Sequence, residues 1–153
     1  MKNAILFAVL LGSISLFSQT TSIREAYREA TKSEENANAF YNLVDNVSKS
    51  DKAVMVAYKG AGKMLLARYE PLTKRKSKIK EAIEWIEAAV KNDSDNPEIR
   101  LIRLSVQENL PKFLKYNDNI DEDRKFVKDA LPKIEDKELV EMIKGYFAGF
   151  SKK

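Results

Sequence analysis

Hydrophobic residues recur along most of the chain at every third or fourth position, which is the spacing of an amphipathic α-helix. The clearest pattern starts at residue 79, and its apolar positions are Ile79, Ala82, Ile83, Ile86, Ala89 and Val90. The strict alternation of apolar and polar residues that marks a half-buried strand does not occur in the sequence. The sequence therefore predicts an all-α fold.

Capping residues and prolines divide the periodic stretches into about seven helices. Five helices are predicted to begin at side chains that accept hydrogen bonds from free backbone N–H groups, namely Ser22, Ser33, Asp51, Asn96 and Asp136. Pro97 suits the first turn of its helix, whereas Pro111 and Pro132 end theirs. A further helix is expected over residues 121–131, with Asp121 at its start.

Two stretches without a clear period are predicted to connect helices. Residues 71–78 form a basic connection, and residues 112–119 are the least regular part of the chain. In the second stretch, we expect the apolar side chains to pack back on the body of the protein, and these are Phe113, Leu114 and Tyr116.

Two glycines stand within the predicted third helix, at Gly60 and Gly62. They weaken a helix but permit a neighbouring element to approach closely. Together with Lys63 they resemble a fragment of a phosphate-binding loop, but Ala57 replaces its first glycine and Met64 its Ser or Thr. We therefore predict a closely packed helix here and no nucleotide site.

The first residues have the pattern of a secretory signal peptide. Lys2 supplies a positive charge, residues 4–17 are almost wholly apolar, and the chain then turns polar. The alternative is a membrane anchor, but an apolar run of about 14 residues is shorter than the ~20 that span a bilayer as a helix. We predict a signal peptide over residues 1–18, cleaved after Ser18 or Gln19, and a single helical domain over residues 19–153. The expected location is periplasmic or secreted, with no transmembrane segment after cleavage.

Composition narrows the chemistry further. The 153 residues include neither cysteine nor histidine, which excludes disulfides, thiolate and imidazole metal ligands, and nucleophilic catalysis by either residue. The 27 basic and 23 acidic residues leave a net charge of +4, an excess too small to indicate nucleic acid. No metal and no cofactor is predicted.

The spacing of Ala82, Ile86 and Ala89 resembles that of the second helix of a tetratricopeptide repeat. The chain departs from that repeat at Ser94, where proline is usual, and no copy follows at an offset of 34 residues. This resemblance implies degenerate, repeat-like helical hairpins and not a true tandem repeat.

The residues from Asn96-Pro97-Glu98-Ile99-Arg100 to Asn109-Leu110-Pro111-Lys112-Phe113-Leu114 resemble a motif of small exported proteins of Gram-negative bacteria. The order of signal, helices, motif and Asp-rich turn is similar as well. Since no activity is assigned to those proteins, the resemblance implies a fold and a compartment, and it adds no catalytic residue.

Two acidic groups are candidates for chemistry. Glu81, Glu84 and Glu87 line one helix, and paired carboxylates can hydrolyse sugars, but these three lie opposite the apolar stripe and are predicted to be surface charge. Residues 117–123 place oxygen side chains at alternate positions, yet they lack the Gly and Glu of an EF-hand loop. Neither group predicts an active site.

Candidate binding residues fall into two sets. The basic connection contributes Lys74, Arg75, Lys76 and Lys78, which either contact an anionic partner or are simply solvated. The last helix contributes Tyr146, Phe147 and Phe150, which either dock on the domain or offer an apolar anchor.

These observations lead to one expected function and one alternative. We expect a non-catalytic interaction or adaptor module that binds another exported or membrane-associated protein, with no nucleic-acid partner. The alternative is a carrier that encloses a hydrophobic small molecule or lipid between facing helices. The sequence does not determine the oligomeric state.

Overall fold

The computed structural model describes residues 22–150, except the side chain of Phe150. The predicted signal peptide lies outside the described residues. Within them the chain forms seven α-helices and no strand, so the all-α prediction is confirmed. The first helix covers residues 22–29, and it is followed by α2 (Glu34–Asn42), α3 (Ala53–Ala67), α4 (Leu72–Asn92), α5 (Pro97–Asn109), η1 (Lys112–Leu114), α6 (Ile120–Ala130), η2 (Leu131–Lys133) and α7 (Lys137–Phe150).

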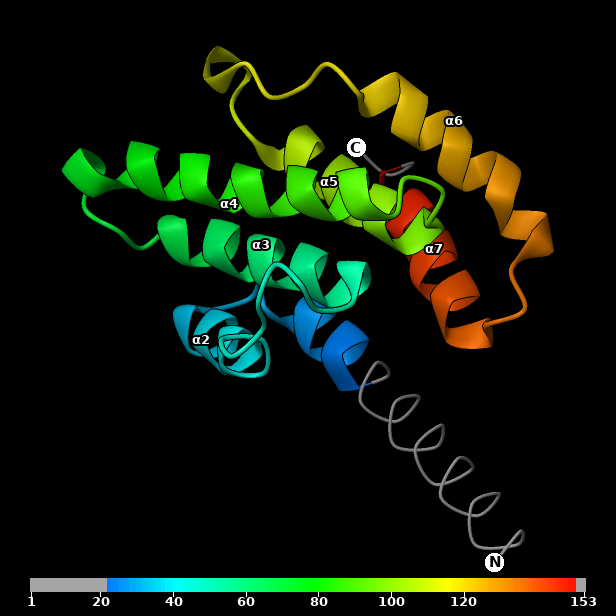
Figure 1. Cartoon of the computed structure of the whole chain (residues 1–153), viewed down its shortest axis with the longest axis horizontal. Coiled ribbons are helices and arrows are strands. Elements are labelled where there is room, and N and C mark those ends of the chain that lie inside the picture. Colours follow the sequence, from blue (N-terminus) through cyan, green and yellow to red (C-terminus); the bar gives the residue numbers. More distant parts are fainter. Residues whose placement is uncertain (1–21, 151–153) are drawn as a thin grey trace, which may run out of the picture.

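Helices that are neighbours in sequence also pack together in space. The long helices α3 and α4 run antiparallel through the middle of the molecule (Figure 1). The short helix α2 covers one side of α3, while α5 contacts both α3 and α4. Helix α6 packs on α5, and α7 closes one end (Figure 1). No helix in the described part of the chain is long and apolar enough to cross a membrane.

The close approach of α3 to α4 depends on Gly60, as its position in the sequence predicts. A Cβ atom at Gly60 would lie 2.7 Å from Cγ1 of Ile86 and 3.1 Å from the carbonyl oxygen of Ala82. Gly62 lies against the Tyr41 ring, where a Cβ would be 3.0 Å from the nearest ring atom. The two glycines therefore bring α3 into contact with helices on two sides.

Three of the predicted caps are confirmed by hydrogen bonds. Ser33 Oγ accepts from a backbone N–H three residues ahead at 3.1 Å. Asn96 Oδ1 accepts from two N–H groups of α5 at 3.0 and 3.3 Å, and Asp136 Oδ1 does the same for α7 at 3.1 and 3.2 Å. The prediction for Asp51 is wrong, because α3 begins two residues later and the Asp51 carboxylate instead accepts from the backbone N–H of Ser48 at 2.7 Å.

The prediction of a basic connection over residues 71–78 is also wrong. The segment forms the first two turns of α4, with Pro71 at the N-cap. Lysine and arginine favour helices, so a basic stretch that lacks an apolar stripe can still be helical when it continues a well-packed helix. The Arg75 guanidinium donates to the carbonyl oxygens of Arg68 and Glu70, both at 3.0 Å, and so satisfies acceptors at the end of α3.

The irregular stretch 112–119 behaves in part as expected. Tyr116 packs inward and donates its hydroxyl to Glu87 at 2.5 Å. Phe113 was expected to pack inward as well, but its side chain is 79% exposed. A single 3-10 turn directs successive side chains to different sides, so η1 cannot present every apolar residue to the core.

Candidate functional site

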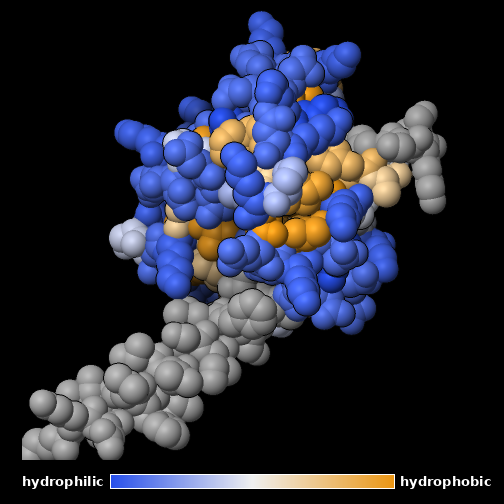
Figure 2. Space-filling view, turned by 90° about the vertical axis from the view of Figure 1, so that its right-hand side faces the viewer, coloured by the Kyte–Doolittle hydropathy of each residue, from blue (hydrophilic) through white to orange (hydrophobic). Residues whose placement is uncertain are grey.

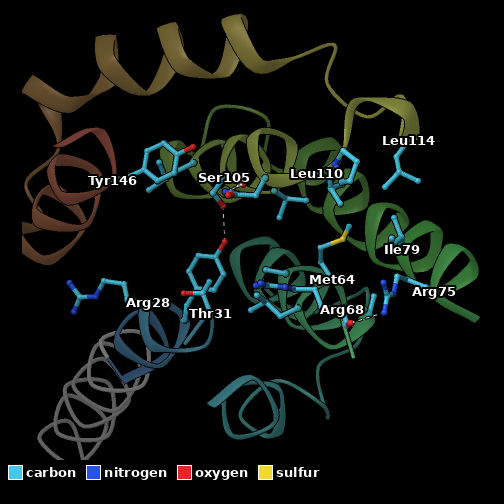
Figure 3. Close-up of a pocket in the computed structure, with 18 of the residues that line it drawn as sticks. Arg28, Thr31, Met64, Arg68, Arg75, Ile79, Ser105, Leu110, Leu114 and Tyr146 are labelled. Carbon is cyan, nitrogen blue, oxygen red and sulfur yellow. Dashed lines mark hydrogen bonds between the residues drawn. The ribbon is translucent and has the colours of Figure 1, made fainter. Parts of the chain in front are cut away.

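A groove opens between several helices of the described part of the chain. It has a volume of about 1710 Å³ and lies between the helix of residues 22–29 and helices α3, α4, α5 and α7 (Figure 3). Its floor consists of apolar side chains of α3, α4, α5 and α7, including Met64, Leu65, Ile79, Leu101, Val106, Leu110 and Met142. Figure 2 shows a band of hydrophobic side chains at the surface of one side of the molecule, framed by hydrophilic ones.

The charged residues on the rim of the groove are mostly basic. Among the described residues that line it, five are cationic, and Glu141 is the one carboxylate. Four of the cations gather where α3 ends, α4 begins and η1 follows α5, and they are Arg68, Arg75, Lys76 and Lys115. Arg28 lies toward the opposite end, on the same side of the view as Tyr146 (Figure 3). The groove therefore combines an apolar floor with a positive rim that is strongest at one end.

Two hydroxyl groups that line the groove are hydrogen-bonded to each other across it. Tyr27 and Ser105 share a hydrogen bond of 2.7 Å that joins the first helix to α5 (Figure 3). Burial raises the pKa of Tyr27, so its hydroxyl stays protonated and neutral over the physiological range. This contact sets the separation of two walls of the groove.

The structure places the predicted basic residues on two sides of α4. Arg75 and Lys76 line the groove, whereas Lys74 and Lys78 are exposed and do not line it. Arg75 is half-buried because its guanidinium bonds the end of α3. Two of the four predicted basic residues therefore lie on a wall of the groove, and the other two lie on the outer surface of α4.

The predicted aromatic residues of the last helix are divided in a similar way. Tyr146 lines the groove and donates its hydroxyl to Glu108, and burial together with this bond raises the pKa of Tyr146. Phe147 packs in the cluster beneath α7, with its ring 5.5 Å from that of Tyr146 and under Lys128. Phe150 ends α7, and its side chain lies outside the described residues. The first two side chains are thus docked on the domain.

The acidic candidates are engaged by neighbouring side chains. Glu81 accepts a hydrogen bond from Lys63 at 2.7 Å, and this bond lowers the pKa of Glu81. Glu87 accepts from Tyr116 and Arg103, so it is not the simple surface charge that the sequence predicts. Glu84 is exposed. The three carboxylates therefore do not converge on a common site.

Residues 117–123 lead into α6, which begins at Ile120, and Asp121, Glu122 and Asp123 lie in its first turn. Asp123 is fully buried and receives two hydrogen bonds from Arg103, at 2.7 and 2.8 Å. Across the described range 22–150, no group of three or more potential ligands is placed to hold a metal ion. The acidic segment thus attaches α6 to α5 through the ion pair of Asp123 with Arg103.

A second buried ion pair was not foreseen. Arg24 bonds Glu98, which also accepts the Tyr58 hydroxyl at 2.5 Å. The sequence held one signal of this pair, since Glu98 occupies an apolar position of its helix, one turn before Leu101 and Ile102. Its charged partner lies 74 residues away, so local pattern could not identify it.

No protein-family model, curated protein or solved structure matches this chain.

Proposed function

We propose that this protein is an exported, non-catalytic interaction module whose groove receives an amphipathic helix of another exported or membrane-associated protein. The observation that supports this most directly is the groove itself. Its volume of about 1710 Å³ is larger than the ~300–1,000 Å³ of sites for small molecules. Helix-in-groove recognition requires an extended apolar floor, and this floor has contributions from several helices.

The charges of the rim define the partner helix more closely. An apolar floor binds the apolar face of such a helix, and flanking cations bind acidic residues at the edges of that face. Arg28, Lys76 and Lys115 are exposed on the rim and available for this purpose. We therefore expect a partner helix with an apolar stripe bordered by Asp or Glu.

A non-catalytic role is supported by the way in which buried ionisable side chains are used. Glu98 and Asp123 both accept hydrogen bonds from buried arginines, so each carboxylate is engaged by a fixed partner inside the protein. A general acid or base instead requires a carboxyl group that can exchange its proton with a substrate. In this proposal these pairs serve to hold the walls of the groove in place.

The helical packing supports the further proposal of degenerate, tetratricopeptide-like hairpins. Sequence neighbours α3 and α4 pack antiparallel, and α5 and α6 also pack on one another. Such hairpin arrays typically present a groove to a peptide or a helix. Export is proposed from the charge and apolar pattern of residues 1–18.

The groove also supports a second candidate function, that of a carrier for a hydrophobic small molecule or lipid. Met64 and Val106 are only 8% exposed and would form an apolar bed for a hydrocarbon chain. A carrier retains its ligand through purification. Native mass spectrometry and organic extraction of the purified chain would reveal that ligand.

Photo-crosslinking from within the groove tests the main proposal. A photoreactive amino acid at Leu110, introduced in the cells that express the protein, is expected to capture one polypeptide. The same group at Leu43, which is exposed and does not line the groove, is expected to capture none. Equal capture from both positions would contradict the proposal, and a bound lipid with no capture would favour the carrier.

A pair of variants in α7 tests whether crosslinking of a polypeptide from Leu110 requires an open groove. Gly145 lines the groove, and a Cβ added there meets no atom within 4 Å, so Gly145→Trp is expected to fill the groove without displacing the core. Ala148→Trp provides the matched control, because Ala148 is exposed and does not line the groove. Capture from Leu110 is expected to be lost in the first variant and kept in the second.

A further inference from the structure

One end of the molecule carries more positive charge than the net charge of the whole chain. We define the basic end as residues 68–80 and 112–115, which come together at one end of the groove where α3 ends, α4 begins and η1 follows α5. These residues include eight cations and one carboxylate, Glu70, a net charge of +7. The whole chain carries +4, so the remainder of the molecule is net negative. Seven of the eight cations are exposed, namely Arg68, Lys74, Lys76, Lys78, Lys80, Lys112 and Lys115.

The same end exposes apolar side chains. Leu72 and Phe113 are each 79% exposed, the highest values among the exposed large hydrophobic residues of the described chain. Tyr69 is a third, at 40%. Leu72 lies at the start of α4 and Phe113 in η1, and both border the end of the same groove. Protruding apolar side chains therefore lie among the lysines of the basic end.

We propose that the basic end docks on the surface of an anionic lipid bilayer, with Leu72 and Phe113 inserted into the headgroup region. Peripheral proteins bind such membranes by combining cations with a few apolar side chains, because each lysine near the surface is attracted by the anionic lipids and each apolar group gains by leaving water. Leu72 and Phe113 border the end of the groove, but the inference rests on their exposure and on the surrounding cations, and it does not depend on what occupies the groove.

The position of the apolar residues favours a membrane over an acidic protein. A protein partner binds hot-spot side chains through a fitted surface, where they become enclosed. Leu72 and Phe113 instead project from an end of the molecule, and the exposed lysines around them belong to different turns and different elements. A fluid layer of anionic headgroups matches this dispersed charge without requiring a fixed geometry.

Tryptophan quenching by brominated lipids tests the proposed insertion. The wild-type chain contains one tryptophan, Trp85, which supplies the background signal. Phe113→Trp places a second tryptophan at the basic end, and Leu43→Trp places one at an exposed position outside the basic end and the groove. With vesicles of brominated phosphatidylglycerol, we expect additional quenching for Trp at position 113 and none for Trp at position 43. Equal quenching at both positions, or none at position 113, would overturn the proposal.

Charge variants of the full chain give a second, independent measurement. The triple variant Lys74→Gln, Lys78→Gln and Lys112→Gln is expected to weaken binding to phosphatidylglycerol vesicles on the order of a hundredfold. The matched control neutralises three exposed lysines outside the basic end, Lys91→Gln, Lys133→Gln and Lys137→Gln, and is expected to bind as the wild type does. Since all variants share the same N-terminal residues, any vesicle binding by that segment is common to every sample.

The outcomes separate this proposal from the proposed function. None of Lys74, Lys78 and Lys112 lines the groove, so the triple variant is expected to leave capture from Leu110 unchanged. Equal vesicle binding by the triple variant and its control would overturn the membrane proposal. Binding of the basic end to an acidic polypeptide, with no binding to anionic vesicles, would overturn it as well and would favour a protein partner.

Discussion

Arg24 and Glu98 form a buried, two-pronged ion pair that joins the first helix to α5. The guanidinium Nε and Nη2 of Arg24 donate to the two carboxylate oxygens of Glu98 at 2.7 and 2.6 Å. Each side chain is only 6% exposed. The same guanidinium donates to Asp136 at 2.8 Å, so it also contacts the residue that caps α7. One arginine thus connects three helices that surround the groove.

We predict that Arg24→Met destabilises the fold by roughly 3–5 kcal/mol, because it leaves the buried Glu98 carboxylate without its charged partner. The free energy of unfolding in urea measures the change. Arg28→Met, one turn further along the same helix and exposed, provides the control and is expected to be within about 0.5 kcal/mol of the wild type. Equal stability of the two variants would show that the pair contributes little.

The Asp136 contacts predict a dependence of stability on pH. Partial burial would raise the pKa of Asp136, but hydrogen bonds from Arg24 and from the backbone N–H of Leu139 outweigh it and lower the pKa below its ordinary value. A carboxylate with a lowered pKa stabilises the fold above its unfolded pKa of about 3.9, and this contribution is lost as the pH falls through the folded value. We therefore expect the unfolding free energy to fall in acid, below about pH 4.

Asp136→Asn tests the origin of this acid dependence. The variant is expected to be less stable than the wild type at pH 7 and to lose less stability on acidification, since its amide does not titrate. Asp129→Asn removes an exposed carboxylate of a surface pair and serves as the control. If both variants follow the wild-type pH profile, Asp136 does not contribute to acid unfolding.

The two glycine environments predict opposite effects of the same substitution. Gly60→Ala places a methyl group 2.7 Å from Ile86 Cγ1 and 3.0 Å from the Ile86 backbone nitrogen, so α3 and α4 must separate. We expect a destabilisation of about 1–3 kcal/mol. Gly145→Ala meets open space within α7 and is expected to stabilise the fold by roughly 0.5–1 kcal/mol. Thermal unfolding of both variants provides the comparison.

Helix α6 depends on Arg103 for its position. Arg103 makes a bidentate contact with Asp123 of α6, which is fully buried. Arg103→Met is expected to lower the protection of α6 amides against hydrogen exchange by about 3 kcal/mol, while α3 amides lose less. Lys125→Met, at an exposed position of α6, is the control. Uniform loss of protection in all helices would instead indicate that α6 unfolds only with the whole domain.

The errors in the sequence-based predictions have a common origin. Residues 71–78 lack an apolar stripe, yet they continue a well-packed helix of good helix formers, and Arg75 also bonds the end of α3. Phe113 is a large apolar residue of the kind usually found in a core, yet the 3-10 turn directs its side chain outward. In both places the outcome depends on geometry that periodicity and capping rules do not describe.

The candidate site was predictable only in part. Arg75, Lys76 and Tyr146 were candidates from the sequence and line the groove, whereas Arg28, Arg68 and the apolar floor were not foreseen as a site. An apolar residue of a helical stripe has the same pattern whether it lies in a closed core or on the floor of a groove. The difference depends on the distance between helices, which the sequence pattern does not contain.

The sequence by itself determined the helical class, the caps at Ser33, Asn96 and Asp136, and the close approach at Gly60. These features follow from interactions within a few residues, so local chemistry is sufficient to specify them. Only the tertiary structure decided that Arg24 meets Glu98, that a groove opens between α3, α5 and α7, and that two basic segments meet at one end. Those features depend on contacts between residues far apart in the chain, which form only when all the helices pack together.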